Sequence, residues 1–278
     1  MAAKKYGMVI DIAKCTGCCN CFLACKDENC NEPHPGYTAA QPMTGQKWLD
    51  VKEIERGTYP KVNIRSIPVT CMHCDNPGCM KQAQNGAVYK RPDGIVIIDP
   101  EKAKGQKDIV NTCPYRRIFW NEELSLPQKC DMCAHLLDRG FAVPRCVELC
   151  PTSALVFGDL NDPESEVSKL MAKNPQPMMP QFGLEERVLY LNYPKNFIAG
   201  SVVFGDTDQC AEGAKVTLKG EGVEREATAD NFGDFWFEDL ETNVAFTVTV
   251  EMPGYEPAVL ETRTLKSVNL GDIILAKK

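Results

Sequence analysis

The spacing of the cysteines limits what this chain can fold into more than any other feature. The 278 residues include fifteen cysteines, and all but Cys210 lie before residue 151. The first group, Cys15-x2-Cys18-x2-Cys21-x3-Cys25, has the spacing of a bacterial-type ferredoxin. In that motif three close cysteines surround one 4Fe-4S cluster and the fourth ligates a neighbouring cluster. The group therefore predicts two clusters that share ligand segments.

A second group has the complementary pattern, Cys130-x2-Cys133-x12-Cys146-x3-Cys150, followed by Pro151. Pairing the two groups across each other gives two complete ligand sets. Set 1 is Cys15, Cys18, Cys21 and Cys150, and set 2 is Cys25, Cys130, Cys133 and Cys146. Each set joins segments that are more than 100 residues apart in the chain.

The middle of the cysteine-rich region contains one further complete ligand set, but it lacks the set that would be paired with it. Set 3 is Cys71, Cys74, Cys79 and Cys113. The full ferredoxin spacing would also have cysteines at four further positions, which are Ala83, Ala103, Gln106 and Ile109 here. Those four cysteines would together have ligated one more cluster. Loss of a whole set while another stays complete predicts three 4Fe-4S clusters and twelve cysteine ligands.

Other uses of these side chains fit the cysteine pattern less well. The second group alone could bind zinc, but that arrangement leaves Cys25 without a role. Disulfides are typical of short secreted chains, and they are disfavoured here because the chain is long and a secretory signal is not predicted.

We expect Cys19, Cys30 and Cys210 to be free thiols, and His34, His73 and His135 to be packing or surface residues. Lys14 and Lys129 each precede a ligand cysteine, where a positive charge would favour the reduced cluster, although solvent exposure is the simpler expectation for both.

Composition and charge exclude several function classes. The net charge is −7, which disfavours nucleic-acid binding. No long apolar run predicts a membrane span, and the N-terminus lacks the apolar region of a secretory signal. We therefore expect a cytoplasmic protein without direct membrane insertion. Serine–histidine–acid, P-loop and Rossmann motifs are also missing from the sequence, so no catalytic residue is predicted.

The composition changes twice along the chain and predicts an α+β protein in three parts. Residues 1–155 are rich in cysteine and turns. Residues 156–195 read as a connector with one helix, in the segment PESEVSKLMAKN. Residues 196–278 contain seven short runs that alternate apolar and polar residues, which predicts a seven-stranded antiparallel β-sandwich resembling the transthyretin and collagen-adhesin B-type modules.

Three sequence segments resemble those of a known family: TCPYRRIFW, KCDMCAHLLD and FGDLNDPESEVSKL. They resemble the iron–sulfur subunits of molybdopterin enzymes of the dimethyl-sulfoxide-reductase superfamily. The resemblance implies tandem ferredoxin-like modules and an electron-transfer role. It also implies a large catalytic partner, in a heterodimer or larger complex, that holds molybdenum or tungsten on two pyranopterin guanine dinucleotides. The active site would lie on that partner.

The resemblance extends to the small subunits of transhydroxylases, which act on hydroxylated aromatics and combine three clusters with a C-terminal sandwich. Small subunits of catechol dehydroxylases, ring hydroxylases and respiratory reductases remain alternatives, as does a structural module braced by its clusters. By analogy with four-cluster relatives, we expect the lost set to be an interior member of the line of clusters. The segment 29–70 contains Pro33, Pro35, Tyr37, Trp48 and Tyr59. A solvent-exposed loop is one interpretation of it, but we expect its aromatic residues to clamp the partner.

Overall fold

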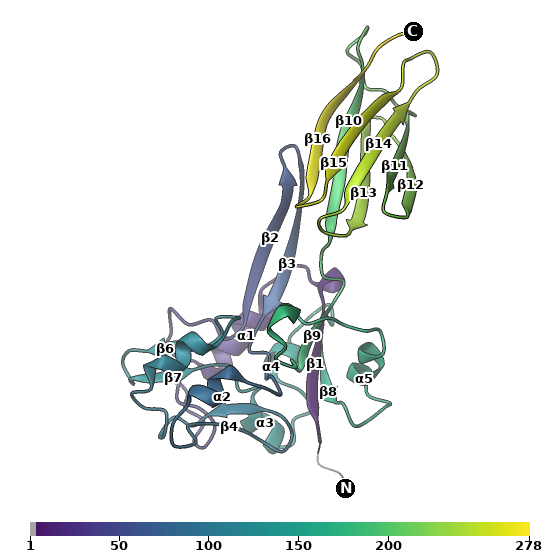
Figure 1. Cartoon of the computed structure of the whole chain (residues 1–278). Helices are drawn as coiled ribbons and strands as arrows, with labels where there is room; N and C mark the ends of the chain where they lie inside the picture. Colours follow the sequence, from purple (N-terminus) through teal and green to yellow (C-terminus); the bar gives the residue numbers. More distant parts are fainter. Residues whose placement is uncertain (1–3) are drawn as a thin grey trace. The chain divides into compact units, whose positions relative to one another are not determined.

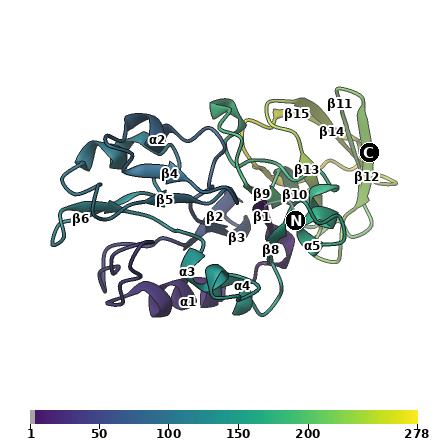
Figure 2. The ribbon, with the colours of Figure 1, turned by 90° about the horizontal axis from the view of Figure 1, so that it is seen from below.

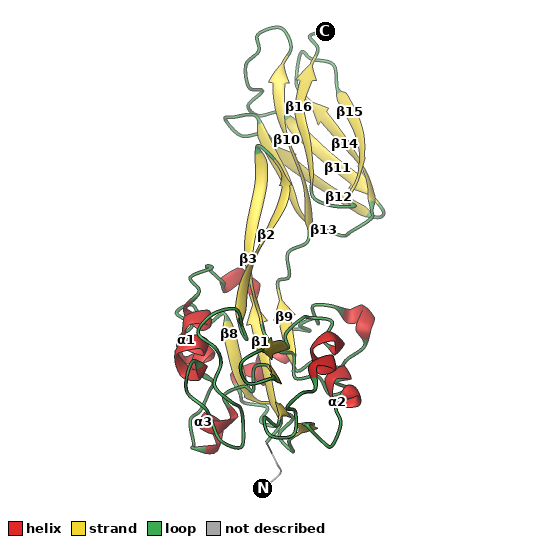
Figure 3. Ribbon diagram, turned by 90° about the vertical axis from the view of Figure 1, so that its left-hand side faces the viewer, coloured by secondary structure: helices red, strands yellow, loops and turns green. Residues whose placement is uncertain are grey.

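The computed structural model describes residues 4–278 and divides into two compact units (Figure 1). The first comprises the chain up to Glu53 and residues 66–193, and the second comprises residues 54–65 and 194–278. The first unit contains short helices joined by long loops, whereas the second is built from strands (Figure 3). No helix within the described residues is both long and apolar enough to cross a lipid bilayer.

A three-stranded sheet forms one side of the first unit. Its central strand β1 (Tyr6–Asp11) pairs antiparallel with β8 (Leu155–Asp159) and parallel with β9 (Val188–Leu191). Five of the six residues of β1 are buried, as expected for a central strand covered on both faces. The predicted connector, residues 156–195, thus supplies two strands to this sheet. Its helix α5 (Glu166–Met171) begins at Ser165, whose hydroxyl accepts the Ser168 N–H.

The cysteine-bearing segments form two halves of this unit, visible on opposite sides of Figure 2. One half contains α1 (Asn20–Asn29), α3 (Ala134–Asp138), α4 (Arg145–Glu148) and the 3-10 turn η1 (Ile12–Lys14). The other contains α2 (Gly78–Gln82), β4 (Val88–Lys90), β5 (Val96–Ile98), η2 (Lys107–Thr112), β6 (Phe119–Asn121) and β7 (Leu126–Gln128). A further turn, η3 (Pro180–Phe182), precedes β9. With so little regular structure, other interactions must position these loops.

The second unit is a two-layer sandwich. One sheet has the order β13-β10-β16 and the other β12-β11-β14-β15. The strands are β10 (Asn196–Phe204), β11 (Lys215–Gly220), β12 (Val223–Thr228), β13 (Asp234–Leu240), β14 (Ala245–Glu251), β15 (Ala258–Arg263) and β16 (Val268–Leu275). The prediction of a purely antiparallel sandwich is wrong at one place, because β10 and β16 run parallel. The chain crosses between the layers before it returns beside β10, and this long connection allows the parallel pair.

The segment 29–70 also differs from its interpretation as a loop. It contains a hairpin of β2 (Asp50–Thr58) and β3 (Lys61–Val69). The outer part of this hairpin belongs to the second unit, where Lys61 forms an ion pair with Asp234. Trp48 is 1% exposed, and its indole N–H donates to Gln46 at 2.8 Å. Trp48 is therefore a core residue of the first unit rather than an interface residue.

Candidate metal centres

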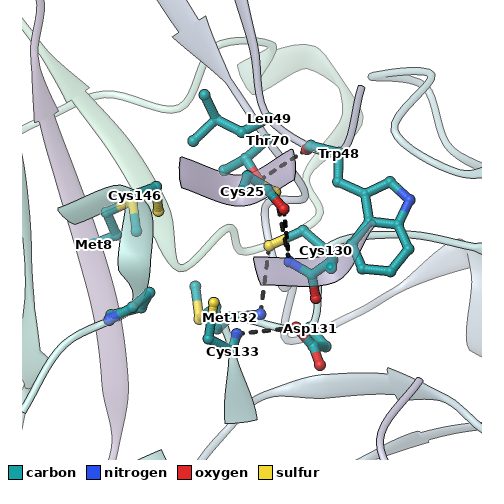
Figure 4. Close-up of a pocket in the computed structure, with 12 residues that line it drawn as sticks. Met8, Cys25, Trp48, Leu49, Thr70, Cys130, Asp131, Met132, Cys133 and Cys146 are labelled. Carbon is teal, nitrogen blue, oxygen red and sulfur yellow. Dashed lines mark hydrogen bonds between the residues drawn. The ribbon is translucent and has the colours of Figure 1, made fainter. Parts of the chain in front are cut away.

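Set 2 surrounds a cavity in the first unit (Figure 4). All four of its cysteines line this cavity, together with Met8, Trp48 and Leu49. Cys25 comes from the end of α1 and Cys146 from α4, two helices that pack against each other. The other two ligands lie at the start of α3, where Met132 and Cys133 adopt positive φ angles that fold the loop around the cavity. The Met132 N–H donates to Cys130 Sγ at 3.3 Å.

Set 1 lines a second cavity, closer to solvent. Cys15, Cys18 and Cys21 reach it from the loop and first turn of α1, and Cys150 reaches it from the end of α4. Cys21 and Cys25 are one helical turn apart, yet they line different cavities. This arrangement is the crossing that the ferredoxin spacing predicts. Cys18 is exposed, which makes set 1 more open to the surface than set 2.

Set 3 lines a third cavity, in the other half of the unit. Cys71, Cys74 and Cys79 come from the loop and helix around α2, and Cys113 follows η2. His73 and Lys129 line the same cavity. The Arg117 N–H donates to Cys113 Sγ at 3.5 Å. The structure thus brings together the members of each predicted set.

The thiols in these cavities repel one another when ionised. Burial raises the pKa of Cys21 to about 12, and neighbouring thiolates of set 1 add to this effect. Burial likewise raises the pKa of Cys79 and of Cys130 to about 11. At Cys150, by contrast, backbone N–H groups outweigh burial and lower the pKa. In set 2 the pKa values of all four thiols are raised, and since iron binds the thiolate form, such a site fits a cationic metal cluster that would hold the thiols ionised.

Three cysteines lie outside the three sets: Cys19, Cys30 and Cys210. None of the fifteen cysteines, all within the described residues, forms a disulfide. Cys19 also lines the set 1 cavity, but its Sγ lies 3.4 Å from the Gly17 carbonyl oxygen, to which it donates. Cys210 is exposed in the second unit.

Comparison with known proteins identifies the family. Residues 62–160 match the 4Fe-4S dicluster domain family, and residues 198–273 match the carboxypeptidase regulatory-like domain family. The chain is 44% identical to the pyrogallol hydroxytransferase small subunit of Pelobacter acidigallici, over 98% of this chain and all of that protein. It is 30% identical to the arsenate respiratory reductase iron–sulfur subunit of a Shewanella species, over 67% of this chain and 96% of that protein. It is 34% identical to a putative dimethyl sulfoxide reductase iron–sulfur subunit of Halobacterium salinarum, over 68% and 79%.

The chain belongs to the iron–sulfur subunits of molybdopterin enzymes. It binds 4Fe-4S clusters and functions in electron transfer.

The four positions without cysteines in this iron–sulfur subunit lie together. Ala103 and Ile109 are buried in an apolar cluster with Cys79, Val88 and Ile98, and Ala83 packs against the same cluster. Gln106 Oε1 accepts the Gln84 N–H at 2.8 Å, and Gln106 Nε2 donates to the Lys102 carbonyl at 2.8 Å. Apolar packing and these hydrogen bonds therefore replace metal ligation at the place where a fourth set would converge.

The order of the three sets contradicts the expectation of an interior gap. The thiolate of Cys21 in set 1 lies near enough to raise the pKa of Cys146 in set 2. The thiolate of Cys71 in set 3 does the same to Cys130 of set 2. Set 2 therefore adjoins both other sets. The replaced site lies on the α2–η2 side of set 3, beside Cys79, so it does not interrupt the series.

Lys129 lies where sets 2 and 3 meet, and the expectation that it is solvent-exposed is wrong. It is 3% exposed, its Nζ donates to the Cys130 carbonyl at 2.9 Å, and it also donates to the Val96 carbonyl. Burial would lower its pKa, but the thiolates of Cys71, Cys79 and Cys130 outweigh burial and raise it. A buried ammonium held between two anionic centres compensates the charge of both. Lys14, by contrast, is exposed.

A group of potential metal ligands outside the three sets has unsuitable geometry. Side-chain atoms of Glu28, His34 and His135 lie within 4.8 Å of one another. However, the two imidazole rings are stacked, with centroids 3.5 Å apart and planes inclined by 11°. A histidine nitrogen directs its lone pair within the plane of its ring, so two stacked rings do not converge on one ion. This agrees with the expectation that these histidines are packing residues.

The crossing can be tested with matched cysteine variants. We expect Cys25→Ser to remove or convert the cluster of Cys130, Cys133 and Cys146, although Cys25 belongs to the first sequence motif. Cys210→Ser should leave every cluster intact, since Cys210 is exposed in the sandwich. Mössbauer and EPR spectra of the anaerobic proteins would identify the affected cluster. Loss in Cys25→Ser of the same signals that are lost in Cys15→Ser would contradict the crossed arrangement.

Lys129 and Lys14 form a second matched pair. We expect Lys129→Gln to shift the midpoint potentials of two clusters to more negative values, because removal of the buried charge disfavours the reduced states. The glutamine amide can still donate to a carbonyl. Lys14→Gln removes a solvent-screened charge and should shift neither potential appreciably. Potentials measured by EPR-monitored redox titration test both; equal shifts in the two variants would contradict the assigned role of Lys129.

Proposed function

We propose that this chain is the three-cluster electron-transfer subunit of a molybdopterin enzyme that acts on hydroxylated aromatic compounds. The observation that carries the proposal is the convergence of twelve cysteines, in three sets of four, on three separate cavities. The replacement of a fourth set by apolar packing supports the count of three. In this proposal each cavity holds one 4Fe-4S cluster, which supplies one-electron transfer.

Residues around the three cavities would give each cluster a different accessibility and reduction potential. Set 1 has an exposed cysteine, so its cluster would be accessible for electron exchange with another protein. Set 2 is buried between the other two sets and would connect them. Backbone N–H groups of Met132 and Arg117 donate to ligand sulfurs in sets 2 and 3, which favours the reduced form of each cluster. Lys129 offsets part of the negative charge where sets 2 and 3 meet.

The partner in this proposal is a large catalytic subunit that holds molybdenum or tungsten on two pyranopterin guanine dinucleotides, in a heterodimer or larger complex. The 44% identity to the pyrogallol hydroxytransferase small subunit, over the full length of that protein, favours a trihydroxybenzene as substrate. The match includes the C-terminal sandwich, whereas the arsenate reductase and dimethyl sulfoxide reductase relatives match only about two thirds of this chain. A cytoplasmic location stays a prediction.

The proposal is tested by purifying this chain anaerobically with its natural partner. We expect a larger subunit to co-purify with molybdenum or tungsten, and the complex to convert pyrogallol without consuming an external electron donor in proportion to product. A complex that instead reduces its substrate with stoichiometric consumption of donor would favour a catechol dehydroxylase or respiratory reductase. Clusters that stay oxidised when the complex is treated with dithionite would contradict an electron-transfer role and favour a structural one.

A further inference from the structure

Met72 and His73 lie between Cys71 and Cys74, and both are buried. Of the two, only His73 has polar side-chain atoms. It is 1% exposed, and its φ angle of 45° is in the left-handed region. It lines the set 3 cavity along with the four cysteines of that set. A polar side chain this deeply buried requires a hydrogen-bond partner for each polar atom.

The protein provides a partner for only one of its two ring nitrogens. The Val96 N–H, on strand β5, donates to His73 Nδ1 at 3.0 Å. Because Nδ1 accepts this hydrogen bond, it carries no hydrogen of its own, and the imidazole is the neutral tautomer with its hydrogen on Nε2. A ring turned by half a revolution would place a carbon atom against the Val96 N–H, so the hydrogen bond also fixes the ring orientation.

The other nitrogen is a donor without an acceptor. His73 Nε2 is buried and has no hydrogen-bond partner among the described residues. The nearby charged groups do not solve this problem, because Lys129, Lys90 and Arg187 are themselves donors. A buried donor left without a hydrogen bond destabilises the folded state. The chain retains that donor at the wall of a cavity where four sulfur atoms converge.

We propose that His73 Nε2–H donates a hydrogen bond to a sulfur atom of the cluster held by set 3, and thereby raises the reduction potential of that cluster. The inference rests on the proposed presence of a 4Fe-4S cluster in this cavity. A hydrogen bond to sulfur stabilises the more negative, reduced cluster more than the oxidised one. The two ring nitrogens of His73 thus have separate roles. Nδ1 fixes the orientation of the ring by accepting from Val96, and Nε2 donates the hydrogen bond that tunes the potential of the cluster.

The two tasks can be separated by two conservative substitutions. Asparagine places its Oδ1 close to the position of histidine Nδ1, so His73→Asn keeps an acceptor for Val96 but loses the distal donor. Glutamine places its Nε2 close to that of histidine, so His73→Gln keeps the distal donor but loses the acceptor. His73→Phe removes both functions and keeps the volume.

The experiment is an EPR-monitored redox titration of the anaerobically purified complex, with iron content measured on the same samples. We expect the midpoint potential of one cluster to shift to a more negative value in His73→Asn and His73→Phe, and to stay near the native value in His73→Gln. Pulsed EPR of the reduced native protein labelled with 15N-histidine should show an exchangeable proton and one histidine nitrogen coupled to that cluster. The histidine nitrogen coupling should vanish in His73→Asn, whereas exchangeable protons of backbone donors such as the Arg117 N–H remain.

The outcomes separate this inference from the proposed function. Three clusters with unchanged potentials in His73→Asn, or a shift in His73→Gln alone, would overturn the inference, since His73 would then act only by holding β5. The three-cluster assignment would survive that result. A native protein with about eight iron atoms per chain, in which Cys113→Ser removes no further cluster signal, would overturn both, because set 3 would hold no cluster.

Discussion

The convergence of cysteines from distant segments is the constraint on which the first unit depends. The first group of ligands lies on α1 and in the loop before it, and its partners lie around α3 and α4, more than 100 residues further along the chain. The helices that carry these ligands are short; α2, α3 and α4 have five, five and four residues. Helices of that length are not stable on their own. Metal–thiolate bonds that join α1 to α4, and the α2 loop to η2, would supply the missing stabilisation.

The same convergence creates an electrostatic problem that particular residues answer. Sulfur atoms that are buried and close together resist ionisation, as the raised pKa values of Cys21, Cys79 and Cys130 show. Iron relieves most of this cost, but each cluster with its thiolates keeps a net negative charge. Lys129 enters the protein interior at the place where two such centres adjoin. Val96 positions two polar residues of the set 3 cavity, because its N–H donates to His73 and its carbonyl accepts from Lys129.

The ligand sets could be predicted from the sequence because the ferredoxin spacing encodes a loop of fixed shape, and because a lost set leaves recognisable gaps. Sequence reasoning failed where burial decides the outcome. Lys129 appears as an ordinary lysine until the positions of Cys71 and Cys130 around it are known. The interior gap was inferred by analogy, and only the adjacency of sets 2 and 3 corrected it. The hairpin β2–β3 follows a segment of prolines and aromatics, and the parallel β10–β16 pair depends on a crossover between layers; neither has a local signal.

The number of clusters per chain tests the central claim most directly. Iron, acid-labile sulfide and zinc should be measured together on protein prepared without oxygen. Three complete sets predict about twelve iron and about twelve sulfide atoms per chain, without zinc. About eight of each would mean that one set stays empty, about sixteen would mean that the replaced site still binds a cluster, and stoichiometric zinc would mean that the cysteines form a different kind of centre. Any of these three results would contradict the account.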